Sequence, residues 1–194
     1  MVKGYSHWIL TNSEVLPDSQ AKIIIIRLEI KMDLKERKLN RLAGFDYSNS
    51  GYYFVTICTK NRINYFGNIV DGQMMLNTYG QIVEHQWVWL QKQYKYVQLD
   101  EYIIMPNHLH GIVIIVGNGR DHSLQEKTKI KSLSELIGAF KTTSSKLIHK
   151  TGLKYFQWQK SFYDHIIRNE HSLFRIQEYI RNNPAKWALD RYYK

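Results

Sequence analysis

Two histidines and one tyrosine carry the clearest chemistry in this sequence. His108 and His110 stand at positions i and i+2 where an apolar strand begins, in the segment MPNHLHG (105–111). Alternate residues of a strand point to the same face, so both imidazoles are expected on one side of a sheet and Leu109 on the other. Two imidazoles on one face can hold a divalent metal ion.

Tyr179 lies four residues before Asn183, and a helix would bring these two side chains to the same side. An amide oxygen can complete the coordination of a hard divalent cation that two imidazoles already bind. A phenol beside a metal ion suits attack on a phosphodiester. The combination predicts a metal-dependent nuclease that attacks DNA with a tyrosine.

Each of these residues also has a structural interpretation. A lone His-x-His in a strand is a weak signal, but this pair interrupts an apolar run, where burying two unpaired imidazoles would be unfavourable. Asn183 can instead cap a helix that ends before Pro184. Tyr163 is a rival nucleophile, which ranks below Tyr179 because no metal-ligand type of residue stands four positions after it.

Composition favours one soluble domain with a polyanionic partner. The chain has 194 residues, of which 44% are hydrophobic and 23% charged, enough for a sizeable core. Its 27 Lys and Arg against 17 Asp and Glu give a net charge of +10. Such a surplus suits nucleic acid, although it also serves to keep a basic protein in solution.

The single cysteine and the absence of long apolar runs predict a cytoplasmic protein with no membrane contact. One cysteine cannot form an internal disulfide, which suggests a reducing compartment, and Cys58 lies mid-strand where core packing is expected. No run approaches the roughly 20 apolar residues of a membrane span. The N-terminus lacks the profile of a signal peptide.

The chain beyond residue 50 alternates strand and helix patterns. A hairpin is expected around Asp71-Gly72, a helix after a Thr78/Gln81 capping box, and a second helix after a Ser132/Glu135 box. The other expected elements are strands over 51–59, 101–105, 108–116 and 162–167 and a helix over 171–183.

This order predicts an α+β fold. The arrangement β-α-β-β-α-β is typical of a ferredoxin-like antiparallel sheet with its helices on one face, here followed by a C-terminal helix that carries Tyr179. Residues 1–36 are expected to form an N-terminal extension of unclear structure, and residues 37–194 the catalytic domain.

Four segments of the chain match a known family. The chain resembles the HUH single-strand transposases that use one tyrosine, particularly the REP-associated tyrosine transposases, also described as IS200-like. The resemblance spans roughly residues 37–190. Its matching segments are 51–62, 102–111, 162–168 and 179–184.

The resemblance implies a site, a cofactor and a substrate. His108 and His110 would be the metal pair and Tyr179 the nucleophile, while Asn183 stands where relatives place a third ligand, often the longer glutamine. The implied metal is Mg²⁺ or Mn²⁺, and the implied substrate is single-stranded DNA with hairpin (palindromic) elements, cleaved through a 5′-phosphotyrosine intermediate. Relatives act as homodimers or as monomers, and both states stay open here.

Basic and aromatic residues outside these motifs are candidates for DNA contact. His165, in one of the matching segments, fits three roles: a hydrogen bond to a metal ligand, a phosphate contact, or a structural histidine. Trp158 is expected to be exposed for base stacking, and Trp87 to lie in the core. The predicted phosphate contacts are Lys127, Lys129, Lys131, Lys141 and Arg168.

Two other functions compete with the tyrosine endonuclease. One is a domesticated DNA-binding protein with the same fold and no cleavage activity. The other is a hydrolase in which His108 and His110 activate water and Tyr179 is structural. A covalent protein–DNA adduct separates the tyrosine enzyme from both.

Overall fold

The structure, a computed structural model, describes residue 42 and residues 44–116 and 130–193, so the predicted extension over 1–36 lies outside the described residues. Among the described residues, no helix is both long and apolar enough to cross a membrane. The strands are β1 (Gly51–Cys58), β2 (Gly67–Val70), β3 (Gln73–Leu76), β4 (Val97–Met105), β5 (His108–Ile115) and β6 (Tyr163–Ile167). The helices are η1 (Lys60–Arg62), α2 (Thr78–Gln93), α3 (Leu133–Lys150), α4 (Glu170–Asn182) and η2 (Pro184–Leu189).

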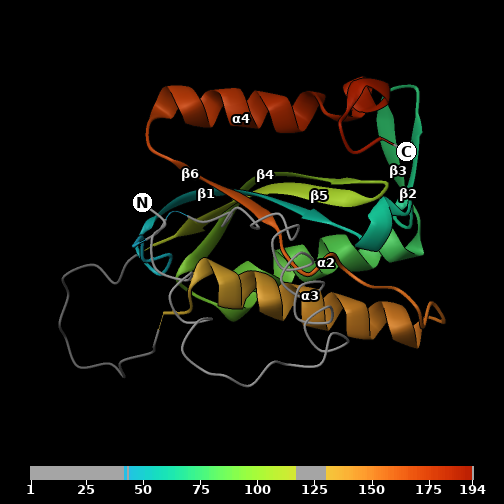
Figure 1. Ribbon diagram of the computed structural model, residues 1–194, viewed down its shortest axis with the longest axis horizontal. Coiled ribbons are helices and arrows are strands. Elements are labelled where there is room, and N and C mark those ends of the chain that lie inside the picture. The colour runs from blue at the N-terminus through green and yellow to red at the C-terminus, as the bar shows by residue number, and fades with distance from the viewer. Residues whose placement is uncertain (1–41, 43, 117–129, 194) are drawn as a thin grey trace, which may run out of the picture. The chain divides into compact units, whose positions relative to one another are not determined.

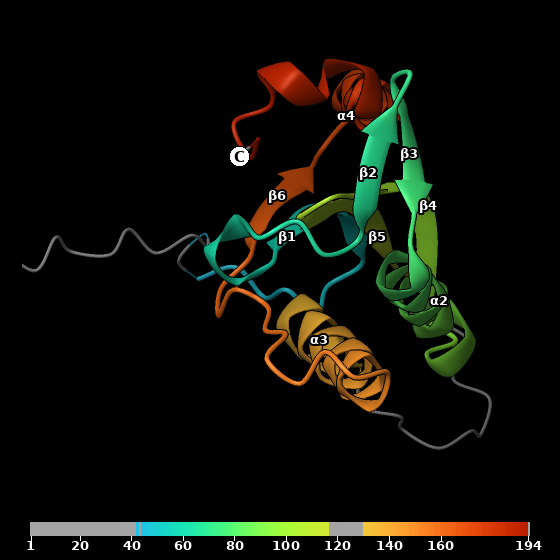
Figure 2. The same cartoon turned by 90° about the vertical axis from the view of Figure 1, so that its right-hand side faces the viewer.

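Four strands form the main sheet, in the order β4-β5-β1-β6 with every neighbouring pair antiparallel. This is the predicted ferredoxin-like sheet, and it is confirmed (Figure 1). Strands β2 and β3 make a separate hairpin beside the sheet (Figure 2). Its turn is the predicted Asp71-Gly72 pair, both with positive φ (50° and 71°), as a tight two-residue hairpin turn requires.

The sheet is covered on both faces. Helices α2 and α3 lie on one face and α4 on the other (Figures 1 and 2). Strand β1 serves both, because Tyr53, Val55 and Ile57 join the core with α2 and α3, while Phe54 packs against Ile180 of α4. Cys58 is buried beside α4's face of the sheet, as expected, and burial raises the pKa of its thiol to about 11.

The helix starts show one prediction confirmed and one corrected. Ser132 and Glu135 form the predicted capping box at the start of α3. At the start of α2, however, the cap is Asn77 and not a Thr78/Gln81 box, because the Asn77 carboxamide oxygen accepts from the backbone N–H groups of Tyr79 and Gly80. Asn77 also donates to the Tyr65 carbonyl, which ties the cap to the segment that precedes the hairpin.

Strand β4 begins at Val97, four residues before its predicted start. The register shifts between Leu99 and Tyr102, so a bulge at Asp100 and Glu101 breaks the apolar alternation that the sequence would otherwise show. The bulge holds α4 against the sheet. Gln177 donates to Asp100 at 2.8 Å, and Arg181 forms an ion pair with Glu101 at 2.7 Å.

The prediction that Trp158 is exposed was wrong. Trp158 is only 9% exposed, pairs by an isolated β-bridge with Thr59, and donates its indole N–H to Ser144 Oγ at 3.0 Å. Phe156 and Trp158 alternate with exposed glutamines, which is the pattern of an extended segment with one buried side. Trp87 lies in the core, as predicted.

Gly111 lets β5 lie close to α2, and adding a methyl group there is expected to be destabilising. A Cβ at Gly111 would lie 2.6 Å from Trp87 Cζ2, so Gly111→Ala should lower the free energy of unfolding by about 1–3 kcal/mol. Gly138, inside α3, has nothing within 4 Å of such a Cβ. Gly138→Ala should therefore raise the free energy of unfolding by about 0.4–1 kcal/mol. Urea unfolding of both variants measures the contrast, and equal effects would contradict it.

Candidate active site

The two histidines lie where the tight turn at Pro106-Asn107 enters β5. Their side chains lie on α4's side of the sheet, where His110 contacts Tyr179 and His108 packs beside Trp187, while Leu109 joins the opposite core with α2 and α3, as predicted. His108 is 0% and His110 1% exposed. The ring of Tyr192, from the C-terminal segment, lies 4.7 Å from that of His108 and accounts for part of this burial.

Asn107 sets the tautomer of His108. The Asn107 amide nitrogen donates to the backbone carbonyls of Arg62 at 3.1 Å and Tyr192 at 2.9 Å, which fixes which end of the amide is oxygen. The oxygen lies 2.8 Å from His108 Nδ1, so this nitrogen carries the proton and donates. His108 Nε2 is therefore left with its lone pair free to bind a metal ion.

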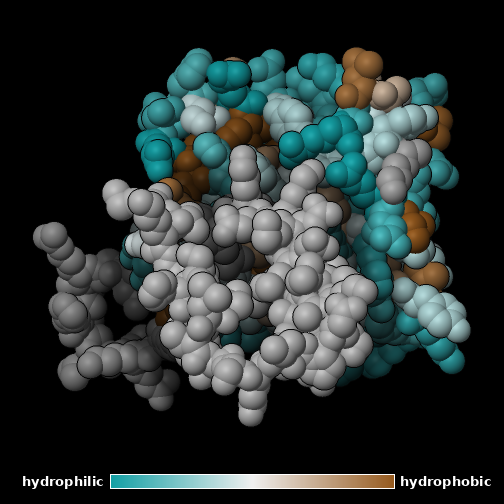
Figure 3. Space-filling model, viewed as in Figure 1, coloured by the Kyte–Doolittle hydropathy of each residue, from teal (hydrophilic) through white to brown (hydrophobic). Residues whose placement is uncertain are grey.

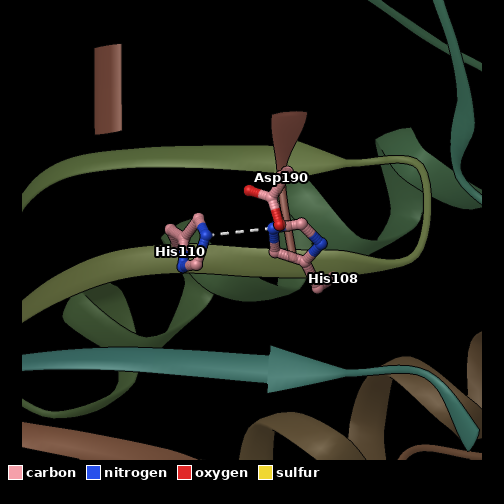
Figure 4. Close-up of side chains that lie close together, drawn as sticks. All are labelled: His108, His110 and Asp190. Atoms are coloured by element: carbon pink, nitrogen blue, oxygen red, sulfur yellow. Dashed lines mark hydrogen bonds between the residues drawn. The ribbon is translucent and has the colours of Figure 1, made fainter. Parts of the chain in front are cut away.

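His110 is oriented in a similar way. Its Nδ1 lies 2.8 Å from Thr56 Oγ1 on the neighbouring strand β1, and its Nε2 lies 3.0 Å from His108 Nε2 (Figure 4). Burial is the main cause that lowers the pKa of both imidazoles, that of His108 to about 3 and that of His110 well below its ordinary value. Both rings are therefore neutral near pH 7, as metal ligands must be.

Asp190 joins the histidine pair from the segment after η2. The ligand atoms of His108, His110 and Asp190 all lie within 4.8 Å of one another (Figure 4). Sequence reasoning missed Asp190, since no motif or periodicity marks it. The available signal was that it is the sole acidic residue in the sequence after Glu178.

Asn183 lies next to Asp190, at the end of α4. Its amide nitrogen donates to Asp190 Oδ2 at 3.0 Å, while its oxygen is buried and has no hydrogen-bond partner among the described residues. A buried carboxamide oxygen without a partner is unfavourable, and coordination of a cation would satisfy it. Asn183 also follows the last residue of α4 and precedes Pro184, so its backbone ends the helix.

The donor set fits a small divalent cation. Two nitrogens at right angles about 2.1 Å from an octahedral cation would be about 3.0 Å apart. The two Nε2 atoms have this separation, and with the proton of His110 on Nδ1, facing Thr56, both Nε2 atoms would offer a lone pair to one cation. A neutral pair of imidazoles, a carboxylate and an amide oxygen make a mixed nitrogen and oxygen set suited to Mg²⁺ or Mn²⁺.

Removing the support of His108 is expected to weaken this cation site. Asn107→Ala should lower the affinity for Mn²⁺ by about 10–100-fold, because His108 loses the acceptor that fixes its tautomer and orientation. Isothermal titration with Mn²⁺ measures the effect, and Asn68→Ala, at an exposed position of β2, serves as the control. Unchanged affinity in a folded Asn107→Ala protein would show that the amide plays no such part.

Tyr179 stands beside the histidine pair. Its hydroxyl lies 3.1 Å from His110 Nε2, and 43% of the residue is exposed. Burial, followed by the negative charge of Asp190, raises the pKa of the phenol to about 12, and Arg191 opposes this shift. The isolated protein therefore holds Tyr179 protonated at neutral pH, and a nearby cation would favour the phenolate.

The other predicted residues lie apart from this cluster. Lys141 lies on α3, on the opposite face of the sheet, and its Nζ donates to the backbone carbonyl of Gln159 at 2.9 Å, while Lys131 directly precedes the N-cap of that helix. His165 and Arg168 are exposed, on β6 and just after it. Lys127 and Lys129 lie outside the described residues. DNA contact by these side chains stays a prediction.

Comparisons with known proteins place the chain among relatives. No family model matches it. It is 35% identical over 170 residues to an uncharacterised protein of Haemophilus influenzae, covering 82% of this chain and 94% of that protein. The chain belongs to the same family as this protein.

A solved structure identifies the fold of this family. The structure of a REP-associated tyrosine transposase bound to a REP hairpin matches 81% of this chain and 77% of its own, with a TM-score of 0.53 and 22% identity. A weaker likeness, with a TM-score of 0.44 and 15% identity, links the chain to a proposed transposase from Deinococcus radiodurans, over 73% of this chain and 95% of that one. The predicted resemblance to the REP-associated tyrosine transposases is confirmed in the fold.

Proposed function

We propose that this protein is a metal-dependent DNA endonuclease and strand transferase that cleaves single-stranded DNA beside a hairpin and forms a covalent link through Tyr179. One observation carries the proposal: the Tyr179 hydroxyl lies 3.1 Å from His110 Nε2, at the edge of a buried, neutral histidine pair whose two Nε2 atoms are 3.0 Å apart. The fold shared with a transposase that binds a DNA hairpin supports the same substrate class.

His108 and His110 are proposed to hold Mg²⁺ or Mn²⁺, with Asp190 and Asn183 as the additional ligands from the C-terminal segment and α4. A bound divalent cation would polarise a non-bridging phosphate oxygen and favour the phenolate form of a nearby tyrosine. The protein orients the metal ligands and the nucleophile, because Asn107 and Thr56 hold the two imidazole rings and the β4 bulge holds α4, which carries Tyr179.

The proposed step is an in-line displacement by Tyr179. The phenolic oxygen forms a bond to phosphorus and gives up its proton, while the bond from phosphorus to the 3′ oxygen breaks and that oxygen gains a proton. The product is a 5′-phosphotyrosine and a free 3′-hydroxyl, so the energy of the phosphodiester is kept for rejoining. The exposed part of Tyr179 gives the substrate access to the nucleophile.

End-labelling tests this proposal. The substrate is single-stranded DNA from the flanks of the gene, bearing a hairpin, labelled at either the 5′ or the 3′ end and incubated with Mn²⁺. The 3′-labelled fragment should migrate with the protein on a denaturing gel, and the 5′-labelled fragment should be released free; a chelator should prevent both. Cleavage with no attached label would favour the hydrolase, and hairpin binding without cleavage would favour the DNA-binding protein.

A further inference from the structure

A groove beside Tyr179 is not used by the metal cluster. It has a volume of about 490 Å³ and lies between β6 and the N-terminal half of α4. We call it the tyrosine groove. Its main lining residues are Phe54, Tyr163, His165, His171, Arg175 and Tyr179.

The strand register explains why these side chains meet. Tyr163 pairs with Thr56 and His165 with Phe54, so alternate residues of β6 point to the same side as the row that contains Phe54 and His110. Arg175 and Tyr179 are four residues apart on α4 and therefore share one face of the helix. The groove is thus fixed by the same elements that place Tyr179 against His110.

Aromatic rings form much of the groove. Phe54 is 8% exposed and stacks on His110 with 5.5 Å between ring centroids, while its ring meets those of Tyr163 and Tyr179 edge-on at 6.3 and 6.1 Å. Tyr163 itself is 42% exposed. On the face drawn in Figure 3, a patch of hydrophobic residues lies beneath the hydrophilic outer surface of α4. An exposed aromatic ring beside a buried one is a suitable platform for a planar partner.

The groove carries an arginine and no carboxylate, which favours a partner that is negatively charged. Arg175 and the two histidines line it, and none of its lining residues is acidic. Arg191 adds a cation 5.7 Å from the centroid of the Tyr163 ring. Exposed aromatic rings together with cations and without carboxylates are the features by which proteins hold unpaired nucleic acid.

We propose that the tyrosine groove binds the unpaired DNA strand next to the phosphate that Tyr179 attacks, with a base stacked on Tyr163 and a phosphate at Arg175. The inference rests on the proposed function for its position in the reaction, but the binding itself does not require cleavage. It also gives Tyr163 a part distinct from that of a nucleophile.

Binding is tested in a protein that cannot react. In the Tyr179→Phe background, fluorescence anisotropy with fluorescein-labelled (dT)₁₂ compares Tyr163→Ala, Tyr163→Phe and Arg175→Ala. Tyr155→Ala is the matched control, because Tyr155 is 90% exposed and does not line the groove. Thermal melting of each variant checks that it is folded.

Loss of the ring at 163 should weaken binding by about fivefold to about a hundredfold, while Tyr163→Phe should stay within about twofold of the parent, because stacking needs the ring and not the hydroxyl. Arg175→Ala should lower the slope of log affinity against log salt by about 0.7, the value for one phosphate contact on a single strand. Tyr155→Ala should change neither quantity.

The groove proposal is overturned if Tyr163→Ala and Tyr155→Ala bind (dT)₁₂ equally well, or if Arg175→Ala leaves the salt slope unchanged. Arg175 is exposed on α4, so its variant carries the test even if Tyr163→Ala fails to fold. Adduct formation by the unaltered protein is assayed in parallel. An adduct with Tyr163-independent binding refutes the groove alone, and Tyr163-dependent binding without an adduct refutes the endonuclease alone.

Discussion

Replacing Tyr179 by phenylalanine is expected to reduce covalent DNA adduct by roughly a thousandfold or more while leaving the fold and Mn²⁺ binding intact. The change removes the one hydroxyl that contacts His110 Nε2 from α4, and it keeps the ring that packs on Phe54. The adduct is measured with labelled hairpin DNA on a denaturing gel, and Mn²⁺ binding by isothermal titration.

Tyr163→Phe is the matched control for this loss. Tyr163 lines the same groove as Tyr179, but the hydroxyl next to the histidine pair is that of Tyr179. The control should therefore retain adduct within about twofold of the unaltered protein, since the stacking ring is kept. An adduct that survives Tyr179→Phe and disappears in Tyr163→Phe would assign the nucleophile to β6.

Truncating either histidine of the pair is expected to have the second largest effect. His108→Ala and His110→Ala should each weaken Mn²⁺ binding by at least about a hundredfold, because each leaves the cation with one imidazole. Cleavage should fall in proportion. Isothermal titration and the cleavage assay measure the two losses.

His85→Ala is the control for the histidine variants. His85 is exposed on α2, on the opposite face of the sheet, and its loss should leave Mn²⁺ affinity unchanged. If His110→Ala bound Mn²⁺ as tightly as His85→Ala does, the histidine pair would not be a cation site. A normal fold in each variant, checked by circular dichroism, separates loss of the site from loss of the protein.

Local patterns in the sequence are strong enough to predict most of the fold. The strands expected over 51–59 and 108–116, the Asp71-Gly72 turn and the Ser132/Glu135 box each depend on neighbouring residues, and each prediction is confirmed. The prediction for Trp158 failed because distant partners decide its environment. Trp158 donates to Ser144 and pairs with Thr59, and its alternation with exposed glutamines is consistent with burial but does not identify these partners.

In the candidate site, too, some residues could be predicted from local motifs and others could not. The proximity of Tyr179 to His110 follows from a motif on β5 and a motif on α4, and the structure brings these hydroxyl and imidazole groups together. The place of Asp190 and the bond of Asn107 to Tyr192 depend on how the C-terminal segment returns over the sheet, and the bond of Asn107 to Arg62 depends on the position of η1. Such long-range contacts leave no spacing in the sequence by which to recognise them.

The phosphate contacts predicted at and before α3 would place DNA on one face of the sheet, and the tyrosine groove would place it on the other. Lys131 and Lys141 lie with α3, on the face opposite Tyr179, whereas Arg175 lies on the helix of the nucleophile. The net charge of +10 does not tell which face of the fold carries the basic residues that bind DNA. Charge alone therefore could not distinguish these two locations. The groove proposal thus adds Arg175 and Tyr163 as candidate DNA contacts in a groove that Tyr179 itself lines.

Mass spectrometry of the trapped adduct tests the central claim most directly. The unaltered protein is incubated with hairpin DNA and Mn²⁺, denatured, and digested with nuclease and trypsin, which separates Tyr179 in peptide 176–181 from Tyr163 in peptide 161–168. A nucleotide mass on Tyr179 is the predicted result. A nucleotide on the 161–168 peptide, or cleaved DNA with no modified peptide, would contradict the assignment of Tyr179 as the nucleophile.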